Sequence, residues 1–66
     1  MLVTVTTITH PEKELIFMFA RIVDKMGYSY SIDNITGTWK IEVMGGCPEK
    51  WTETFLDVIS LYTYSK

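Results

Sequence analysis

The chain has 66 residues, a formal net charge of −2 and 47% hydrophobic residues, and 14% of its residues are aromatic. This composition is typical of one small packed domain spanning residues 1–66, and it lacks the clustered Lys and Arg that binding to nucleic-acid phosphates requires. A single cysteine, Cys47, excludes a disulfide within the chain, and with His10 as the one imidazole we expect no metal or other cofactor.

Nothing in the sequence suggests a membrane partner. No apolar run approaches the roughly 20 residues that span a bilayer. Residues Met1 to Thr9 also lack the basic start and the long apolar stretch of a signal peptide. We therefore expect a cytoplasmic protein.

The segment from Leu2 to Thr9 is rich in β-branched residues, which predicts the first strand. Alternation places Val3, Val5 and Thr7 on one face and Leu2, Thr4, Thr6 and Ile8 on the other. Because both faces carry apolar residues, we expect either a central position in the sheet or a bulge near Thr6-Thr7. The same strand is also the candidate for an open edge, since no charge or proline interrupts it.

A helix from about His10 to Met26 should follow, with Thr9 and Glu12 forming a capping box and Gly27 ending it. Its apolar stripe is predicted to be Leu15, Phe19, Ile22, Val23 and Met26. Phe17 falls among charged residues on the opposite face. That position makes Phe17 either a scattered surface hydrophobe or an anchor for a partner.

The segments 28–32 and 39–43 alternate in polarity, and residues 33–37 between them have turn chemistry, which together predict a hairpin. Gly45 and Gly46 end it, in a simple turn rather than a phosphate loop. A second helix then begins at Cys47-Pro48-Glu49. Residues 62–66 fit either its last turn or a fourth strand.

The element order β-α-β-β-α predicts an α+β fold, with a three-stranded sheet in the order 1-3-2 and both helices packed on one face. We expect the first and third strands to be parallel neighbours, joined by a right-handed crossover. The order of elements resembles a ferredoxin-like unit that lacks its last strand. This resemblance implies no activity.

In the complete plan the missing strand would cover the free side of the first strand. Without it, that strand exposes an edge that no charged residue protects. We therefore predict self-association, giving a homodimer, through a dimer edge formed by Val3, Thr4, Val5, Thr6 and Thr7. Pairing of this kind would also compensate for the small core of so short a chain.

A second predicted contact surface lies on the helices. It comprises the anchor and its basic neighbour on the first helix and an acidic stripe on the second, namely Phe17, Arg21, Glu49, Glu53 and Asp57. The acids stand at successive i, i+4 positions. A charged helix face is usually only solvated, so the stripe is the weaker part of this prediction.

We expect a small protein-binding module, an adaptor or inhibitor that occupies a partner's surface and is not an enzyme. Compact acidic domains of this kind are common among proteins encoded by bacteriophages, which suggests a viral origin. One alternative is a regulatory protein associated with nucleic acid through Lys13, Arg21, Lys25 and Lys40. Another is an enzyme or redox role of Cys47 with His10, which we expect at the same end of the sheet.

Overall fold

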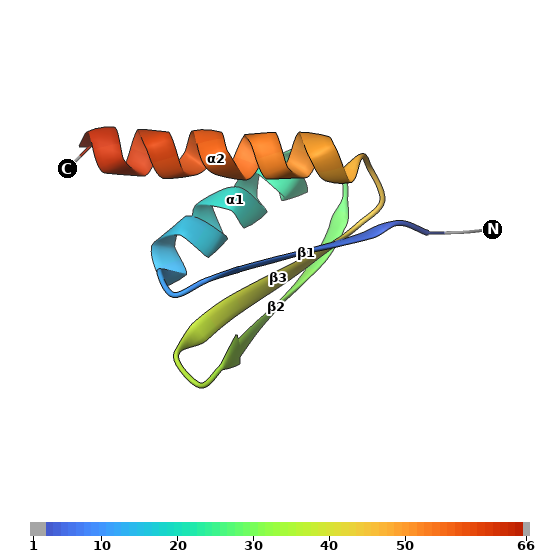
Figure 1. The fold of residues 1–66 in the computed structure, drawn as a ribbon. Coiled ribbons are helices and arrows are strands. Elements are labelled where there is room, and N and C mark those ends of the chain that lie inside the picture. Colours follow the sequence, from blue (N-terminus) through green and yellow to red (C-terminus); the bar gives the residue numbers. More distant parts are fainter. Residues whose placement is uncertain (1–2, 66) are drawn as a thin grey trace.

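The computed structural model describes residues 3–65, which form three strands and two helices (Figure 1). The elements are β1 (Val5–His10), α1 (Lys13–Lys25), β2 (Ser29–Ile35), β3 (Thr38–Met44) and α2 (Pro48–Ser65). The sheet order is β1-β3-β2, so the predicted α+β fold and strand order are confirmed. The helices lie together on one side of the sheet, with α2 along β1 and beside α1 (Figure 1).

Two predictions about the first strand are wrong. The first strand lies at an edge and β3 is central, and β3 runs antiparallel to both of its neighbours. The strand directions explain this arrangement. The chain passes through α1 back to the end of the sheet where β1 begins, so β2 runs parallel to β1, and the hairpin then makes β3 run in the opposite direction. The crossover therefore joins β1 to β2, and β3 fills the space between them.

The start of α1 also differs from the prediction. Thr9 and His10 continue β1, and the helix begins at Lys13 with Glu12 as its N-cap. The Glu12 side chain makes no capping bond. Instead, the Glu12 N–H donates to Nδ1 of His10 at 3.0 Å, so the expected capping box is replaced by the histidine.

The end of α1 follows the prediction at Gly27, whose φ of +85° is easily reached by glycine. The N–H of Gly27 donates to the carbonyl of Asp24, and the N–H of Tyr28 donates to the carbonyl of Val23. These two bonds form a Schellman motif, which satisfies carbonyls that the helix leaves unpaired.

The hairpin between β2 and β3 is tighter than predicted. Residues 33–35 belong to β2, which leaves a two-residue loop of Thr36 and Gly37. Both have positive φ, at 49° and 84°, as a type I′ turn requires. This turn sets the register of β2 against β3 from Ile35–Thr38 onward.

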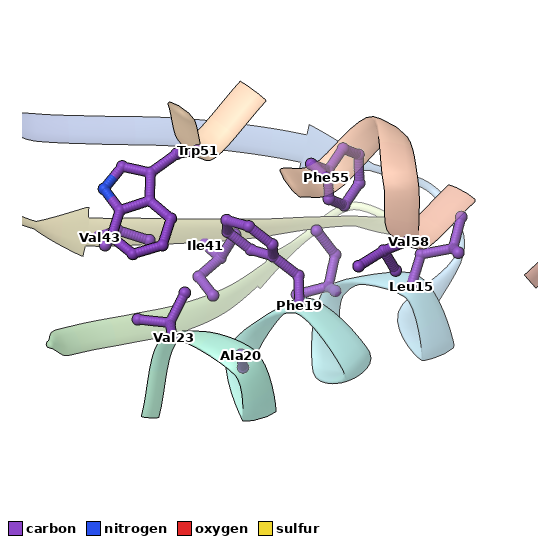
Figure 2. Close-up of a cluster of buried hydrophobic side chains, with 10 residues drawn as sticks. Leu15, Phe19, Ala20, Val23, Ile41, Val43, Trp51, Phe55 and Val58 are labelled. Carbon is purple, nitrogen blue, oxygen red and sulfur yellow. The ribbon is translucent and has the colours of Figure 1, made fainter. Parts of the chain in front are cut away.

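The core lies between the sheet and the two helices (Figure 2). Phe19 is at its centre and makes edge-to-face contacts with Trp51 at 6.0 Å and with Phe55 at 5.5 Å between ring centroids. The other buried apolar side chains are Leu15, Ile16, Ala20, Val23, Ile41, Val43 and Val58. The opposite face of the sheet is open, with polar side chains such as Thr7, Ser31 and Glu42 at its centre and the exposed Val5 and Met44 at one end.

The long helix α2 begins with Pro48 in its first turn, as predicted, and the carbonyl of Cys47 accepts from the N–H of Trp51. The helix continues to Ser65, so residues 62–65 end a helix and form no fourth strand. Lys66, the last residue of that prediction, lies outside the described residues. Within residues 3–65, β1 therefore has a strand on one side only.

Candidate functional site

The free side of β1 presents backbone groups at every second residue. The register places Thr4 opposite Gly45, and the carbonyl of Thr4 accepts from the N–H of Gly45 at 2.6 Å. In an antiparallel pair, residues alternate between bonding inward and facing outward. The even-numbered residues of β1 therefore bond to β3, while Val5, Thr7 and Thr9 direct their N–H and C=O groups to the free edge.

The predicted dimer-edge residues differ in the face on which their side chains lie and in how exposed those side chains are. Val3, Val5 and Thr7 lie on the open face, where Val3 is 64% and Val5 is 50% exposed, and Thr4 is also exposed. Thr6 is instead buried on the helix side of the sheet, at 8% exposure. Because the backbone of Thr6 also bonds inward to β3, a partner at this edge would reach neither its hydrogen-bonding groups nor its side chain.

Two glycines hold β1 in place at the beginning of the strand. Gly45 bonds to Thr4, and its carbonyl accepts from Nε1 of Trp51 at 2.9 Å. At Gly46 a Cβ atom would lie 2.6 Å from the same indole nitrogen. The two residues form the predicted turn. The lack of a side chain lets Gly46 pack directly on the buried Trp51, while Gly45 lies against the ring of Tyr28.

Phe17 is less isolated than its sequence context suggests. Its ring makes an edge-to-face contact with Trp39 of β3, 5.7 Å between centroids, and Nζ of Lys13 lies 5.6 Å from both rings. Phe17 remains 41% exposed, and Arg21, one turn later, is exposed. The side of α1 that carries Phe17 thus faces β3. Lys13 and Phe17 are i, i+4 neighbours on the helix, but no sequence pattern links them to residue 39.

The acidic stripe lies elsewhere. Glu49, Glu53 and Asp57 lie on the side of α2 that faces away from the buried stripe of Trp51 and Val58. Phe17 contacts the sheet at β3, whereas α2 lies over β1. The structure therefore separates the predicted helix surface into two areas rather than one shared patch.

The predicted pairing of His10 with Cys47 is wrong. His10 lies opposite Trp39 at the start of β3, whereas Cys47 follows Met44 at the other end of that strand. The antiparallel direction of β3 causes this separation. His10 packs edge-to-face on Phe55 at 5.9 Å, and Cys47 is exposed.

The described part of the chain shows few features of a metal, ligand or nucleic-acid site. Among residues 3–65, no three His, Cys, Asp or Glu side chains come close enough to hold a metal ion, and no pocket is present. On the open face, Lys40 lies 3.7 Å from Glu42, which offsets its charge toward a phosphate. Trp39 at the start of β3 and Tyr28 just before β2 both pack against the core, so they are not free as stacking platforms for bases.

No helix within the described residues has the length and apolar character needed to cross a membrane. The chain matches no protein-family model, no curated protein and no solved structure.

Sequence reasoning missed two features of the edge. Thr9 faces outward with Val5 and Thr7, because β1 extends to His10 and no helix begins there. Met44, 44% exposed, lies opposite Val5 and enlarges the apolar end of the open face. A strict period of two, continued through Thr9, would have found the first of these.

Proposed function

We propose that this chain is a small protein-binding module that recognises other proteins by strand addition at the free edge of β1. The observation that carries the proposal is the outward row of backbone groups on Val5, Thr7 and Thr9, on a strand without charge or proline from Val3 to Thr9. Edges of folded sheets are usually blunted by Lys, Pro or a bulge. Strand addition uses such an edge directly, through main-chain hydrogen bonds.

A module of this kind acts by occupying a surface, so an adaptor or an inhibitor in the cytoplasm is the role we propose. The bacteriophage origin stays a prediction. The helix residues Phe17 and Arg21 and the acids of α2 offer a second, side-chain surface for the same role. The edge of β1 is favoured because Phe17 is already engaged by Trp39 and Lys13.

The test uses two proline variants. Thr7→Pro removes an N–H that faces the free edge of β1 while leaving the inward bonds of the β1–β3 ladder. Asn34→Pro is the matched control on β2: since Trp39 of β3 bonds toward β1, its β2 partner Asn34 faces the outer edge. Proline at an outward edge position is tolerated by a sheet.

Affinity-tagged wild type, Thr7→Pro and Asn34→Pro would be incubated with a lysate of the source organism, and their bound proteins compared. We expect wild type and Asn34→Pro to retain the same proteins and Thr7→Pro to lose them. Circular dichroism would check that all three are folded. If Thr7→Pro retains the full set, strand addition at β1 is refuted.

A further inference from the structure

We infer that the β1 edge binds a second copy of this chain, with a two-fold axis at Thr7 that also brings the two α2 helices side by side. This inference rests on the proposed strand addition and names its partner, its register and a second contact. Backbone complementarity supports it first. A strand whose outward groups alternate regularly is complementary to itself when it is turned antiparallel.

The register follows from the positions of the outward residues. With the axis at Thr7, the two Thr7 residues pair with each other, and Val5 of each copy pairs with Thr9 of the other. An axis at Thr9 would set Thr7 against Pro11, which has no N–H to donate. An axis at Val5 would leave Thr9 beyond the described strand of the other copy. An axis at Thr6 would pair Val5 with Thr7 but set Thr9 against Val3, which lies outside β1, so only the axis at Thr7 keeps all three outward residues paired within β1.

Within the sheet, charge does not oppose the strand pairing. On the open face Thr7 neighbours Glu42 of β3. The two copies of Glu42 would be separated by three strand spacings, about 14 Å, which exceeds the Debye length of about 8 Å in physiological salt. The side chains that meet directly are Val5 and threonines, and such pairs are favourable across strands.

Strand pairing alone is too small for a stable dimer. A strand of six residues is about 20 Å long, and a sheet layer is about 10 Å thick, so the edge covers roughly 200 Å² per copy. Stable interfaces bury about 1,200 Å² or more in total. A second contact is required, and the helix above β1 is placed to make it.

The position of α2 over the edge strand supplies that contact. Phe55 packs on His10 of β1, and Val58 points toward Leu15 of α1 (Figure 2). The side of α2 away from α1 therefore carries Leu56, with Thr52 one turn before it. Leu56 is 56% exposed, so its apolar surface is available for a contact. A two-fold at β1 would bury it between antiparallel α2 helices.

The first test is the solution mass of the purified chain. We expect twice the 7.6 kDa of one chain at micromolar concentration, and a single-chain mass for Thr7→Pro. A wild type that stays at the single-chain mass, while still capturing other proteins through β1, refutes the second copy and leaves the proposed function standing. A dimer that survives Thr7→Pro refutes pairing of the two copies at β1, and the capture experiment then decides the proposed function separately.

Register is tested by disulfide trapping in a Cys47→Ser background. Paired residues in this register have Cα atoms about 5.5 Å apart, within the range a disulfide spans. Under copper–phenanthroline oxidation, Thr7→Cys should crosslink with itself. Thr9→Cys alone should not, and it should crosslink when mixed with Val5→Cys. Self-crosslinking of Thr9→Cys but not of Thr7→Cys overturns the register.

The helix contact is tested by Leu56→Asp, with Tyr64→Asp as its control. Both changes replace an exposed apolar residue of α2 by aspartate, but Tyr64 lies on the outer side of the helix and is 94% exposed. We expect Leu56→Asp to raise the dimer dissociation constant about tenfold or more and Tyr64→Asp to leave it unchanged. Equal dissociation constants for the two variants overturn the α2 contact.

Discussion

The turn of Gly45 and Gly46, which bonds to Thr4 and packs on Trp51, offers a quantitative test of the packing around the indole. Gly46 has a φ of +76°, and a Cβ added there would lie 2.6 Å from Nε1 and 2.9 Å from Cε2 of Trp51. Trp51 is 1% exposed and cannot move outward without opening the core. Gly46→Ala should therefore strain the backbone, displace the indole and break its bond to the carbonyl of Gly45.

The expected loss is the sum of three effects. Alanine at positive φ costs about 1 kcal/mol relative to glycine, overpacking a core costs about 1–3 kcal/mol, and the lost hydrogen bond costs about 1 kcal/mol. The total is about 3–5 kcal/mol. A domain of this length has a free energy of unfolding of about 3–10 kcal/mol, so a large part of its stability would be lost.

Gly37→Ala is the matched control. Gly37 has a similar φ of +84°, but no atom lies within 4 Å of the place that an added Cβ would take, so this variant carries the backbone strain alone, about 1 kcal/mol. Urea unfolding followed by circular dichroism, at one protein concentration, would compare both with wild type. If Gly46→Ala is no more destabilising than Gly37→Ala, the indole of Trp51 is not packed against Gly46 and the predicted loss of stability is refuted.

Three further predictions concern single side chains. Thr6→Val should raise the free energy of unfolding by about 1 kcal/mol in urea titrations, because Oγ1 of Thr6 is buried with no hydrogen-bond partner among the described residues; a destabilised variant would show that the hydroxyl is bonded. Phe17→Asp should leave the domain folded but lower its free energy of unfolding by about 1 kcal/mol through the lost contact with Trp39. Titration with a captured partner then tests whether the helix surface around Phe17 binds that partner. Binding as tight as that of wild type would refute this role. Cys47 should react with iodoacetamide no faster than a cysteine in an unfolded peptide, because His10 is at the other end of the sheet; rapid alkylation at neutral pH would revive the enzymatic alternative.

Local patterns were sufficient to predict most of the elements. The period of two in residues 39–43, the helical stripe around Phe19 and Val23, and the glycine at 27 each depend on neighbours along the chain. Such features follow from side-chain alternation and from backbone φ preferences. The same local rules identified the uncharged edge on which the proposed function depends.

What failed were inferences about direction and about contacts distant in the sequence. The expectation that β1 and β3 run parallel was wrong, and the supposed proximity of His10 and Cys47 failed with it. Phe17 fell on the polar side of a helical wheel, yet its ring reaches Trp39 because α1 lies across the sheet at that point.

The sequence by itself determined where strands and helices form, because hydrophobic period, β-branching and glycine act within a few residues. Only the tertiary structure decided that β3 runs antiparallel to β1, that Val5, Thr7 and Thr9 face outward and that α2 lies over β1. These features depend on the placement of β3 between β1 and β2, which run parallel to each other. That placement is a property of the whole fold, and no short stretch of residues contains the information.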